Sequence, residues 1–240
     1  MRTQSPPLRP TTETEVHIPV EGGTLEGLLA IPDRSDGLVI FVHGSGSSRN
    51  SPRNRFVAHQ LQAAGLGTLL FDLLTPPEEA EDWVTLNRRF NIPLLADRLV
   101  EATHWAADQA GVEGRRIGFF GASTGAAAAL VASTQPGCPV EAIVSRGGRP
   151  DLAGTALRKV TVPSLLIVGG DDWDVLQLNR NAMSNLRCKS DLQLIPGATH
   201  LFEEPGALDQ VSHLAGAWFR RYLLLDSTTR KTHVPVLTIP

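Results

Sequence analysis

The stretch that decides the fold is RRIGFFGASTGAAAALVAS, residues 115–133. It runs from an apolar segment typical of a buried strand into an alanine-rich segment typical of a helix, and Ser123 stands at the junction between Gly121 and Gly125. Glycine commonly occupies positions where the chain turns tightly or where another backbone comes close. Two interpretations compete. Ser123 either caps the following helix, or it is the nucleophile of a G-x-S-x-G elbow, in which a sharp strand-to-helix turn exposes a serine hydroxyl.

Several other segments share the buried-strand character of the segment before Ser123. They are nearly continuous runs of apolar residues, which is typical of strands covered on both faces in a parallel sheet. The strong examples are GLVIFVHG (37–44), GLGTLLFD (65–72) and PSLLIVGGDD (163–172), and the weaker ones are VEAIVS (140–145) and SDLQLIPG (190–197). Between them lie helical candidates, in which apolar residues recur every three or four positions. These cover residues 54–64, 93–110, 125–133, 175–187 and 207–224.

This alternation of strands and helices predicts an α/β fold with a doubly wound, mostly parallel sheet flanked by helices. Residues 15–31 alternate apolar and polar side chains around Gly22 and Gly23, which predicts an N-terminal antiparallel hairpin. The order of the strands in the sheet does not follow from these patterns.

The length of 240 residues and a composition of 42% hydrophobic and 20% charged residues predict one globular domain. We place it at residues 15–225, between a polar, proline-rich and disordered tail (1–14) and a C-terminal tail (226–240) whose segment HVPVLTIP could add an edge strand. Residues 75–95 form a long polar connection bounded by prolines, which is either an exposed excursion or a small cap over a site.

The charge distribution excludes some classes of partner. Acidic and basic residues are interspersed and give a net charge of −3, so the chain has no field of one sign to attract nucleic acid or anionic lipid. The longest apolar block is far shorter than the ~20 residues that cross a bilayer. Residues 1–15 contain no apolar run typical of a signal peptide. We therefore expect a cytoplasmic protein with a small-molecule partner, no nucleic-acid or membrane partner, and an oligomeric state that the sequence leaves open.

Polar residues follow four of the predicted strands at the point where each strand ends. They occur in residues 43–46 (HGSG), around Ser123, in residues 169–172 and in residues 197–200. Ligands of open parallel sheets bind beyond the carboxyl ends of the strands, where loops converge and helix N-termini point at them. The four segments are therefore predicted to meet at one edge of the sheet and to form the site.

Ser123 has the two partners that a serine nucleophile needs. A serine hydroxyl becomes nucleophilic when an imidazole removes its proton, and the imidazole needs a carboxylate to fix its tautomer and stabilise its charge. His200 is the predicted base. Asp172 is the first candidate for the acid and Asp171 the second, whereas Asp174 stands just before a predicted helix and is interpreted as its cap.

The oxyanion of an acyl intermediate needs preorganised hydrogen-bond donors. The backbone N–H of Thr124, at the start of its helix, and that of Ser45 are the expected donors, so Thr124 is expected to contribute its amide rather than its side chain. His43 lies in the same loop as Ser45 and is interpreted as structural, orienting that loop by hydrogen bonding. It is also kept as a candidate to contact the substrate.

Further residues are candidates to bind the substrate. Arg146 follows a predicted strand at the same edge, where it could hold a substrate anion or pair with Asp151 or another acid. Arg89 and Phe90, in the long connection, could line a pocket or simply pack under the loop. The arginines at positions 49, 53 and 55 are interpreted as a solvated basic cluster, with phosphate binding as the alternative. His200 and Glu203 are three residues apart, but no second histidine stands at helical spacing from them, so no metal is expected.

Taken together, these motifs resemble the α/β-hydrolase superfamily, and most of all its dienelactone hydrolase family. The resemblance covers residues 15–224 and rests on FVHGSGSSR (41–49), GASTGAAAAL (121–130), VSRGGRPDL (144–152), LLIVGGDDWDV (165–175) and IPGATHLFEEPGAL (195–208). The order serine, aspartate, histidine along the chain is that of α/β-hydrolases. The family pattern G-G-x-D-x-x-V, aligned on residues 169–175, selects Asp172 as the acid. The resemblance implies hydrolysis of an ester or a lactone without a cofactor.

The enzymes that name the family carry a cysteine nucleophile where this chain has Ser123. Serine lacks the intrinsic nucleophilicity of a thiolate, which argues against dienelactone itself as the substrate. Relatives of this shape include esterases and promiscuous phosphotriester hydrolases, and some similar sequences are fused to a phosphoribosyltransferase-like domain that we do not expect within these residues. The sequence therefore predicts a serine esterase or lactonase that forms an acyl-enzyme intermediate. The alternatives are a phosphotriester hydrolase with the same triad and a non-catalytic binding protein of the same fold.

Overall fold

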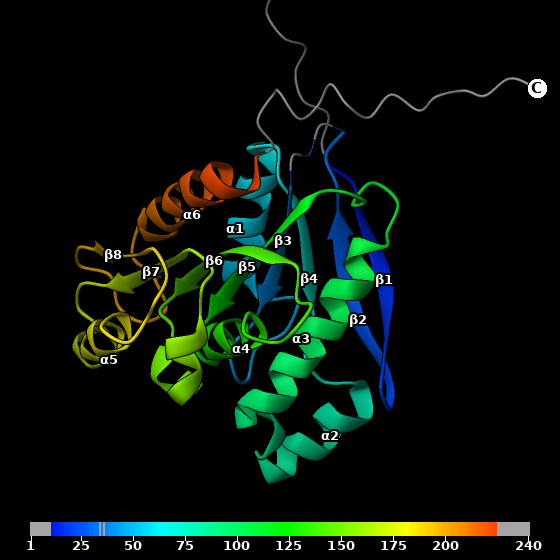
Figure 1. Cartoon of the computed structure of the whole chain (residues 1–240), viewed down its shortest axis with the longest axis horizontal. Helices are drawn as coiled ribbons and strands as arrows, with labels where there is room; N and C mark the ends of the chain where they lie inside the picture. Colours follow the sequence, from blue (N-terminus) through cyan, green and yellow to red (C-terminus); the bar gives the residue numbers. More distant parts are fainter. Residues whose placement is uncertain (1–10, 34, 36, 225–240) are drawn as a thin grey trace, which may run out of the picture.

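The computed structural model describes residues 11–33, 35 and 37–224 of the chain. The strands of these residues form an eight-stranded sheet in the order β1-β2-β4-β3-β5-β6-β7-β8 (Figure 1). β1 pairs with β2, and β2 with β4, in antiparallel fashion, and the other neighbouring pairs are parallel. The predicted fold class, a mostly parallel α/β sheet with an N-terminal antiparallel hairpin, is therefore confirmed.

The strand bounds follow the apolar runs of the sequence closely. The strands are β1 (Glu13–Val20), β2 (Gly23–Ala30), β3 (Gly37–Val42), β4 (Gly67–Phe71), β5 (Arg116–Ala122), β6 (Val140–Arg146), β7 (Ser164–Gly169) and β8 (Ser190–Ile195). β1 begins within the predicted N-terminal tail (1–14), so the last two residues of that segment belong to the hairpin. Residues 1–10 and the predicted C-terminal tail (226–240), with its expected edge strand, lie outside the described residues.

Alternate side chains of the central strands enter two hydrophobic clusters, one on each face of the sheet. In β3, Leu38, Ile40 and Val42 join the cluster that also contains residues of α3 (Ile92–Ala107) and α4 (Thr124–Ala132). Val39 and Phe41 join the cluster with residues of α1 (Pro52–Ala63) and α6 (Ala207–Leu223). Successive side chains of a strand point to opposite faces, and both faces are covered by helices, which is why the apolar runs are continuous.

The helices form two layers around the sheet. α3 and α4 pack together on one face, and α1 and α6 pack together on the other (Figure 1). The remaining helical elements are α2 (Pro76–Thr85), η1 (Arg88–Phe90), η2 (Pro150–Lys159) and α5 (Trp173–Met183). None of the helices within the described residues is both long and apolar enough to cross a membrane.

The long polar connection at residues 75–95 contains α2 and η1 and follows the carboxyl end of β4. A capping box starts α2: the Glu78 N–H donates to Thr75 Oγ1 at 3.4 Å, and the Thr75 N–H donates to Glu78 Oε2 at 2.9 Å. At the other end of the helix, the buried Asp82 carboxylate accepts the Arg88 N–H at 2.6 Å. These bonds give the connection a defined shape at the end of the molecule that is lowest in Figure 1.

Candidate active site

Ser123 lies in a sharp turn between β5 and α4. Its backbone has φ 50° and ψ −122°, a conformation that residues other than glycine rarely adopt. The Ser123 N–H donates to the Arg146 carbonyl at the end of β6 at 3.3 Å, which ties the turn to the neighbouring strand. The Ser123 side chain makes no capping hydrogen bond to α4. The capping interpretation of Ser123 is therefore wrong, because the turn directs its hydroxyl away from the helix amides.

The two glycines of the motif are required by close backbone contacts. A Cβ atom on Gly125 would lie 2.5 Å from the His43 carbonyl oxygen and still closer to that of Val42. A Cβ on Gly121 would lie 2.5 Å from Ala126 Cα. Helix α4 therefore starts directly against the end of β3, which brings the loop after β3 next to Ser123.

Asp172 and His200 lie at the carboxyl ends of the next strands. The His200 Nδ1–H donates to Asp172 Oδ2 at 2.7 Å. Asp171 is exposed and contacts the His200 loop through its backbone, with its N–H donating to the Ala198 carbonyl at 3.0 Å. The expected capping role of Asp174 is wrong, because α5 begins at Trp173 and Asp174 already lies within its first turn.

Ser123 and His200 line one cavity of about 260 Å³. His200 uses Nδ1 for the bond to Asp172, which leaves Nε2 as the nitrogen that could receive a proton. In the described part of the chain no hydrogen bond joins Ser123 Oγ to His200. We call this cavity, which is also lined by Gly44, Ser45, Arg53 and Arg146, the nucleophile cavity.

The two expected oxyanion donors lie side by side, but in an arrangement that the sequence did not predict. The Ser45 N–H donates to Thr124 Oγ1 at 2.8 Å. The Thr124 hydroxyl therefore also contacts the neighbouring loop, whereas only its amide was expected to take part in the site.

His43 connects the Ser45 loop to the end of β4. Its Nδ1–H donates to the Gly44 carbonyl at 2.9 Å, and the Leu73 N–H donates to Nε2 at 3.1 Å. Burial lowers the pKa of His43, which keeps the ring neutral and in the tautomer that these two bonds need. Both ring nitrogens are engaged, so they are not available to bind a substrate.

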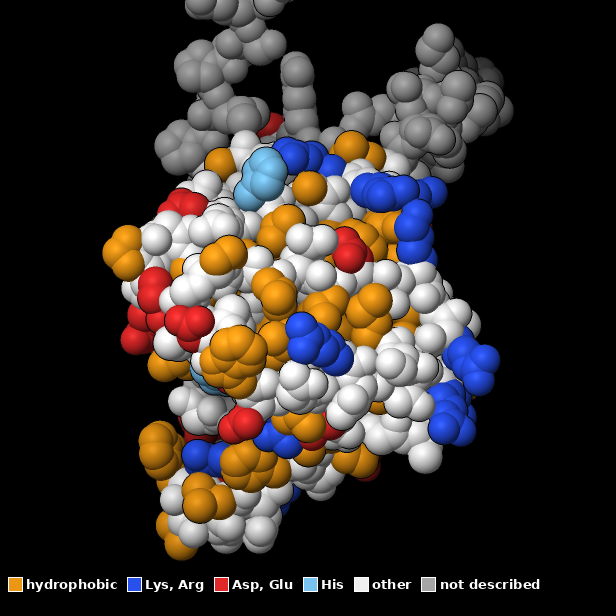
Figure 2. Space-filling view, turned by 90° about the vertical axis from the view of Figure 1, so that its left-hand side faces the viewer, with side chains coloured by type: hydrophobic (Ala, Val, Ile, Leu, Met, Phe, Trp, Pro, Cys, Tyr) orange, Lys and Arg blue, Asp and Glu red, His pale blue; other side chains and the backbone are white. Residues whose placement is uncertain are grey.

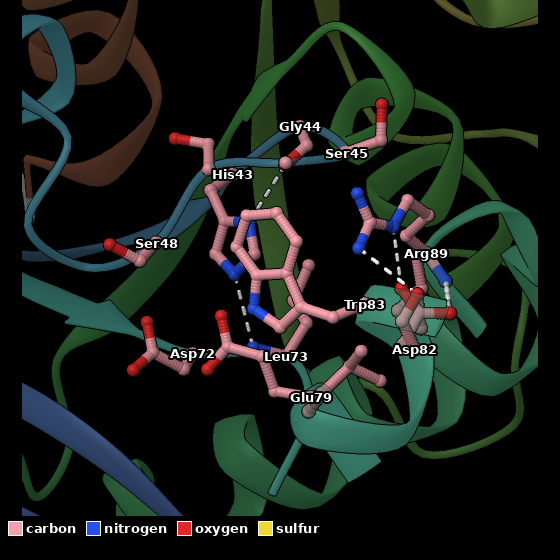
Figure 3. A pocket seen from close by; sticks show the side chains of 14 residues that line it. His43, Gly44, Ser45, Ser48, Asp72, Leu73, Glu79, Asp82, Trp83 and Arg89 are labelled. Atoms are coloured by element: carbon pink, nitrogen blue, oxygen red, sulfur yellow. Dashed lines mark hydrogen bonds and ion pairs between the residues drawn. The ribbon is translucent and has the colours of Figure 1, made fainter. Parts of the chain in front are cut away.

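A second cavity of about 200 Å³ is lined by the Ser45 loop and by residues of α2 (Figure 3). Gly44, Ser45 and Ser47 line both cavities, so the two cavities adjoin at this loop. The Trp83 ring points into the second cavity, and the Arg89 guanidinium lies 5.4 Å from its centroid.

The two substrate candidates of the long connection differ in position. Arg89 lines the second cavity, where its Nε–H donates to Asp82 Oδ2 at 2.5 Å. Phe90 is 55% exposed and is not among the residues that line either cavity. It belongs to an exposed hydrophobic group at the lower end of the molecule, where Figure 2 shows hydrophobic side chains among charged ones. The other members are Trp83, Val84 and Leu86.

Arg146 lines the nucleophile cavity, as expected for a residue at this edge. Its expected pairing with Asp151 is wrong: Asp151 binds Arg149 through two hydrogen bonds of 2.9 and 2.8 Å. Arg146 instead contacts Asn54 of α1, which was not among the predicted site residues. A signal was present, because Asn54 shares the helical spacing of the buried Val57, Ala58 and Leu61.

No group of three or more histidine, cysteine, aspartate or glutamate side chains among the described residues is placed to hold a metal ion. The cavity that Ser123 and His200 line lies next to the bond between His200 and Asp172, so a serine, an imidazole and a carboxylate are close together.

Solved structures resemble this chain over about nine-tenths of its length. A dienelactone hydrolase from Anabaena variabilis is 52% identical with a TM-score of 0.87, and the match covers 90% of this chain and 100% of that protein. The enzyme P91 from metagenomic libraries, a dienelactone hydrolase-like promiscuous phosphotriesterase, is 16% identical with a TM-score of 0.70. That match covers 90% of this chain and 100% of P91. At that identity the likeness shows the fold alone. No protein-family model matches the chain.

Curated relatives from two strains of Mycobacterium tuberculosis are 52% identical over 220 residues. They carry a provisional name, phosphoribosyl transferase. The match covers 91% of this chain but only 48% of each relative, so the chain spans about half the length of these proteins. Their name describes proteins twice as long and does not say what the matched half does.

Proposed function

Because the chain belongs to the dienelactone hydrolase-like family of α/β-hydrolases, we propose that it is a serine hydrolase that cleaves a carboxylic ester or a lactone. The observation that carries the proposal is the 2.7 Å bond between Asp172 and His200, together with the placement of His200 and Ser123 on one cavity. No other described element brings an imidazole, a carboxylate and a strained serine to one place.

The proposed reaction begins with attack by Ser123 Oγ on the carbonyl carbon of the substrate. His200 Nε2 takes the hydroxyl proton, and Asp172 stabilises the imidazolium through the bond to Nδ1. The tetrahedral intermediate then breaks its bond to the leaving oxygen, which takes the proton from His200. The acid part of the substrate stays on Ser123 as an ester. A water molecule, deprotonated by His200, releases it and restores the serine hydroxyl.

The oxyanion of each intermediate is held by the backbone N–H groups of Thr124 and Ser45. The Thr124 hydroxyl accepts the Ser45 N–H at 2.8 Å. Rotation of the buried Thr124 side chain about χ1, from one staggered rotamer to another, would free that donor. The substrate oxyanion would then take the place of the hydroxyl oxygen, with charge-assisted bonds that are stronger than the one they replace.

The two cavities suggest how the substrate lies. Both open onto the Ser45 loop, which carries an oxyanion donor, so an ester whose carbonyl binds there would extend one part into each cavity. The second cavity offers the ring of Trp83 and the apolar chains of Leu73 and Leu95, which suit an apolar part of the substrate.

Turnover by wild type and by Ser123→Ala tests the proposal, with p-nitrophenyl acetate, a γ-lactone and a phosphotriester as substrates. We expect hydrolysis of the carboxylic esters or the lactone, and a loss of roughly 10³-fold or more in kcat in the variant. Ser133→Ala is the matched control, because Ser133 caps the opposite end of α4 and its hydroxyl donates to Leu130 at 2.7 Å. Its activity should be unchanged.

Three results would contradict the proposal in different ways. Turnover of the phosphotriester alone, dependent on Ser123, would identify a phosphotriester hydrolase. Unchanged ester turnover in Ser123→Ala would rule out the triad mechanism. If no substrate is turned over and a fluorophosphonate probe fails to label Ser123, the protein is a non-catalytic member of the family.

A further inference from the structure

Helix α2, which lines the second cavity, turns its polar side toward the rest of the molecule. Of its ten residues, all within the described part of the chain, Asp82 is the one that is buried. The Asp82 carboxylate accepts the Arg88 N–H at 2.6 Å and the Arg89 Nε–H at 2.5 Å. Glu78, one turn before Asp82, binds Arg98 of α3 at 3.2 Å. This is the reverse of an ordinary surface helix, which buries its apolar side.

Exposed apolar side chains gather on the opposite side of α2 and on η1. Pro77, Ala80 and Val84 lie three and four positions apart, so they share one side of the helix, and all three are exposed. Val84 is 85% exposed. Figure 2 shows this end of the molecule, where hydrophobic side chains reach the surface. We call the exposed apolar residues of this segment the cap patch; its members are Pro77, Ala80, Trp83, Val84, Leu86 and Phe90.

The cap patch is large enough to form the centre of a protein interface. Trp83 is 67% and Phe90 is 55% exposed, and aromatic side chains bury about 150–250 Å² each, so these two alone offer roughly 200–300 Å². A standard interface covers about 800 Å² of each partner and surrounds an apolar centre with polar residues. Monomeric proteins rarely leave an apolar patch of this size uncovered.

The charges beside the cap patch favour a second copy of this chain as the partner. Glu79 and Glu81 lie within α2, whereas Arg88 and Arg89 lie beyond its end in η1, so the two ends of the segment carry opposite charges. A two-fold axis through the patch would run the two segments antiparallel and place the acidic end of each on the basic end of the other. Arg88 already binds Glu81 of its own chain at 2.8 Å, and its remaining N–H donors are free to bind a partner's carboxylate as well.

Other partners fit these charges less well. Acidic and basic side chains are both present at the patch, so it has no positive field to attract anionic lipid or nucleic acid.

The cap patch is continuous with the second cavity through Trp83. The Trp83 ring points into that cavity, yet the residue is largely exposed, so this wall of the cavity faces solvent (Figure 3). A partner that packs on the cap patch would cover this wall from outside.

We propose that two copies of this chain associate through the cap patch across a two-fold axis, and that each copy closes the second cavity of the other beside Trp83. The inference goes beyond the proposed hydrolysis and does not depend on it, because association needs neither a substrate nor Ser123.

Sedimentation velocity of the full chain over a range of concentrations tests the association. We expect wild type to form a dimer with a Kd of about 10 µM or less. Val84→Glu should raise this Kd by at least about 100-fold, because the symmetry would bury two carboxylates in one apolar interface. Phe90→Ala should raise it about tenfold, since an aromatic side chain of the interface is lost.

Leu194→Glu is the matched control, because Leu194 is also exposed but lies on the edge strand β8. Its Kd should equal that of wild type. Circular dichroism and urea unfolding check the fold of each variant. Val84→Glu should fold normally, because Val84 is exposed and glutamate favours a helix.

Acrylamide quenching of tryptophan fluorescence tests the closure of the second cavity. Quenching should be stronger in monomeric Val84→Glu than in dimeric wild type, and this difference should disappear when both chains also carry Trp83→Phe. Equal quenching in wild type and Val84→Glu would refute the closure.

Two results would overturn the association itself. A wild type that stays monomeric up to about 100 µM forms no such dimer, and flotation of that monomer with phosphatidylcholine vesicles would assign the cap patch to a lipid surface instead. A dimer that survives in Val84→Glu and Phe90→Ala but is lost in Leu194→Glu would place the contact on the edge of the sheet. Each of these results leaves the proposed hydrolysis untouched.

Discussion

Replacing Ser123 by glycine should make the protein more stable than replacing it by alanine, although both changes remove the proposed nucleophile. The backbone at this position has φ 50° and ψ −122°. For a residue with a Cβ this conformation costs about 1–3 kcal/mol, and glycine adopts it freely. The greater freedom of glycine in the unfolded chain offsets about 0.5–1 kcal/mol. Ser123→Gly should therefore exceed Ser123→Ala by about 1 kcal/mol, and by no more than about 2.5 kcal/mol, in the free energy of unfolding.

Urea unfolding and thermal unfolding of the two variants measure this difference. For a domain of this length, 1 kcal/mol corresponds to a shift of about 2–4 °C in Tm. Ala128→Gly is the matched control, because Ala128 lies buried within the same helix and the change to glycine there should lower stability by about 1 kcal/mol or more. The reasoning is refuted if Ser123→Gly is no more stable than Ser123→Ala, since the turn would then carry no strain.

Three further changes test other parts of the site. Gly125→Ala should lower the free energy of unfolding by at least about 3 kcal/mol, because the added Cβ would meet the backbone of β3. Gly216→Ala is the control and should be neutral or stabilising, because its Cβ would contact only Leu61 Cδ2 at 3.5 Å. Equal urea midpoints for the two variants would contradict this prediction. Asp172→Asn should lower kcat by roughly 10³- to 10⁴-fold in ester assays, while Asp171→Asn should retain it within about twofold, and the reverse ranking would identify Asp171 as the acid. Since burial lowers the pKa of His43 in the folded state, the unfolded state binds the proton first as the pH falls below about 6.5, and stability should decline there by up to about 1.4 kcal/mol per pH unit. Urea unfolding at several pH values should show a shallower decline in His43→Gln, and parallel curves would argue against this linkage.

The fold was predictable because each central strand is covered on both faces and leaves a continuous apolar run in the sequence. The helices were predictable from the spacing of their apolar residues, because each helix buries one face against the sheet. The order of the strands was not predictable, because the same runs fit many orders of a parallel sheet. The rule that polar residues gather beyond the carboxyl ends of strands was enough to bring Ser123, Asp172 and His200 to one edge, and the bond between the last two appears in the structure.

The details that sequence patterns missed depend on contacts between distant segments. Thr124 and Ser45 are 79 residues apart, and their bond depends on how closely α4 approaches the end of β3. Asn54 and Arg146 are 92 residues apart, and no local pattern says that the arginine points away from Asp151. The start of α5 was missed because Trp173 already has helical backbone, directly after Asp172, whose side chain bonds to His200. The helix therefore begins before Val175, where the apolar spacing starts.

The strand order also bears on how the protein acquires its activity during folding. Strand β5, which leads to Ser123, lies in the middle of the sheet, whereas Asp172 and His200 follow β7 and β8, which are added at one side, with β8 as the edge strand. Parallel pairing of this kind joins segments that are distant along the chain and is slow compared with helix formation. A refolding chain should therefore regain most of its helical circular dichroism before the sheet is complete. Recovery of the proposed hydrolysis would then report when the carboxyl ends of β5, β7 and β8 come together.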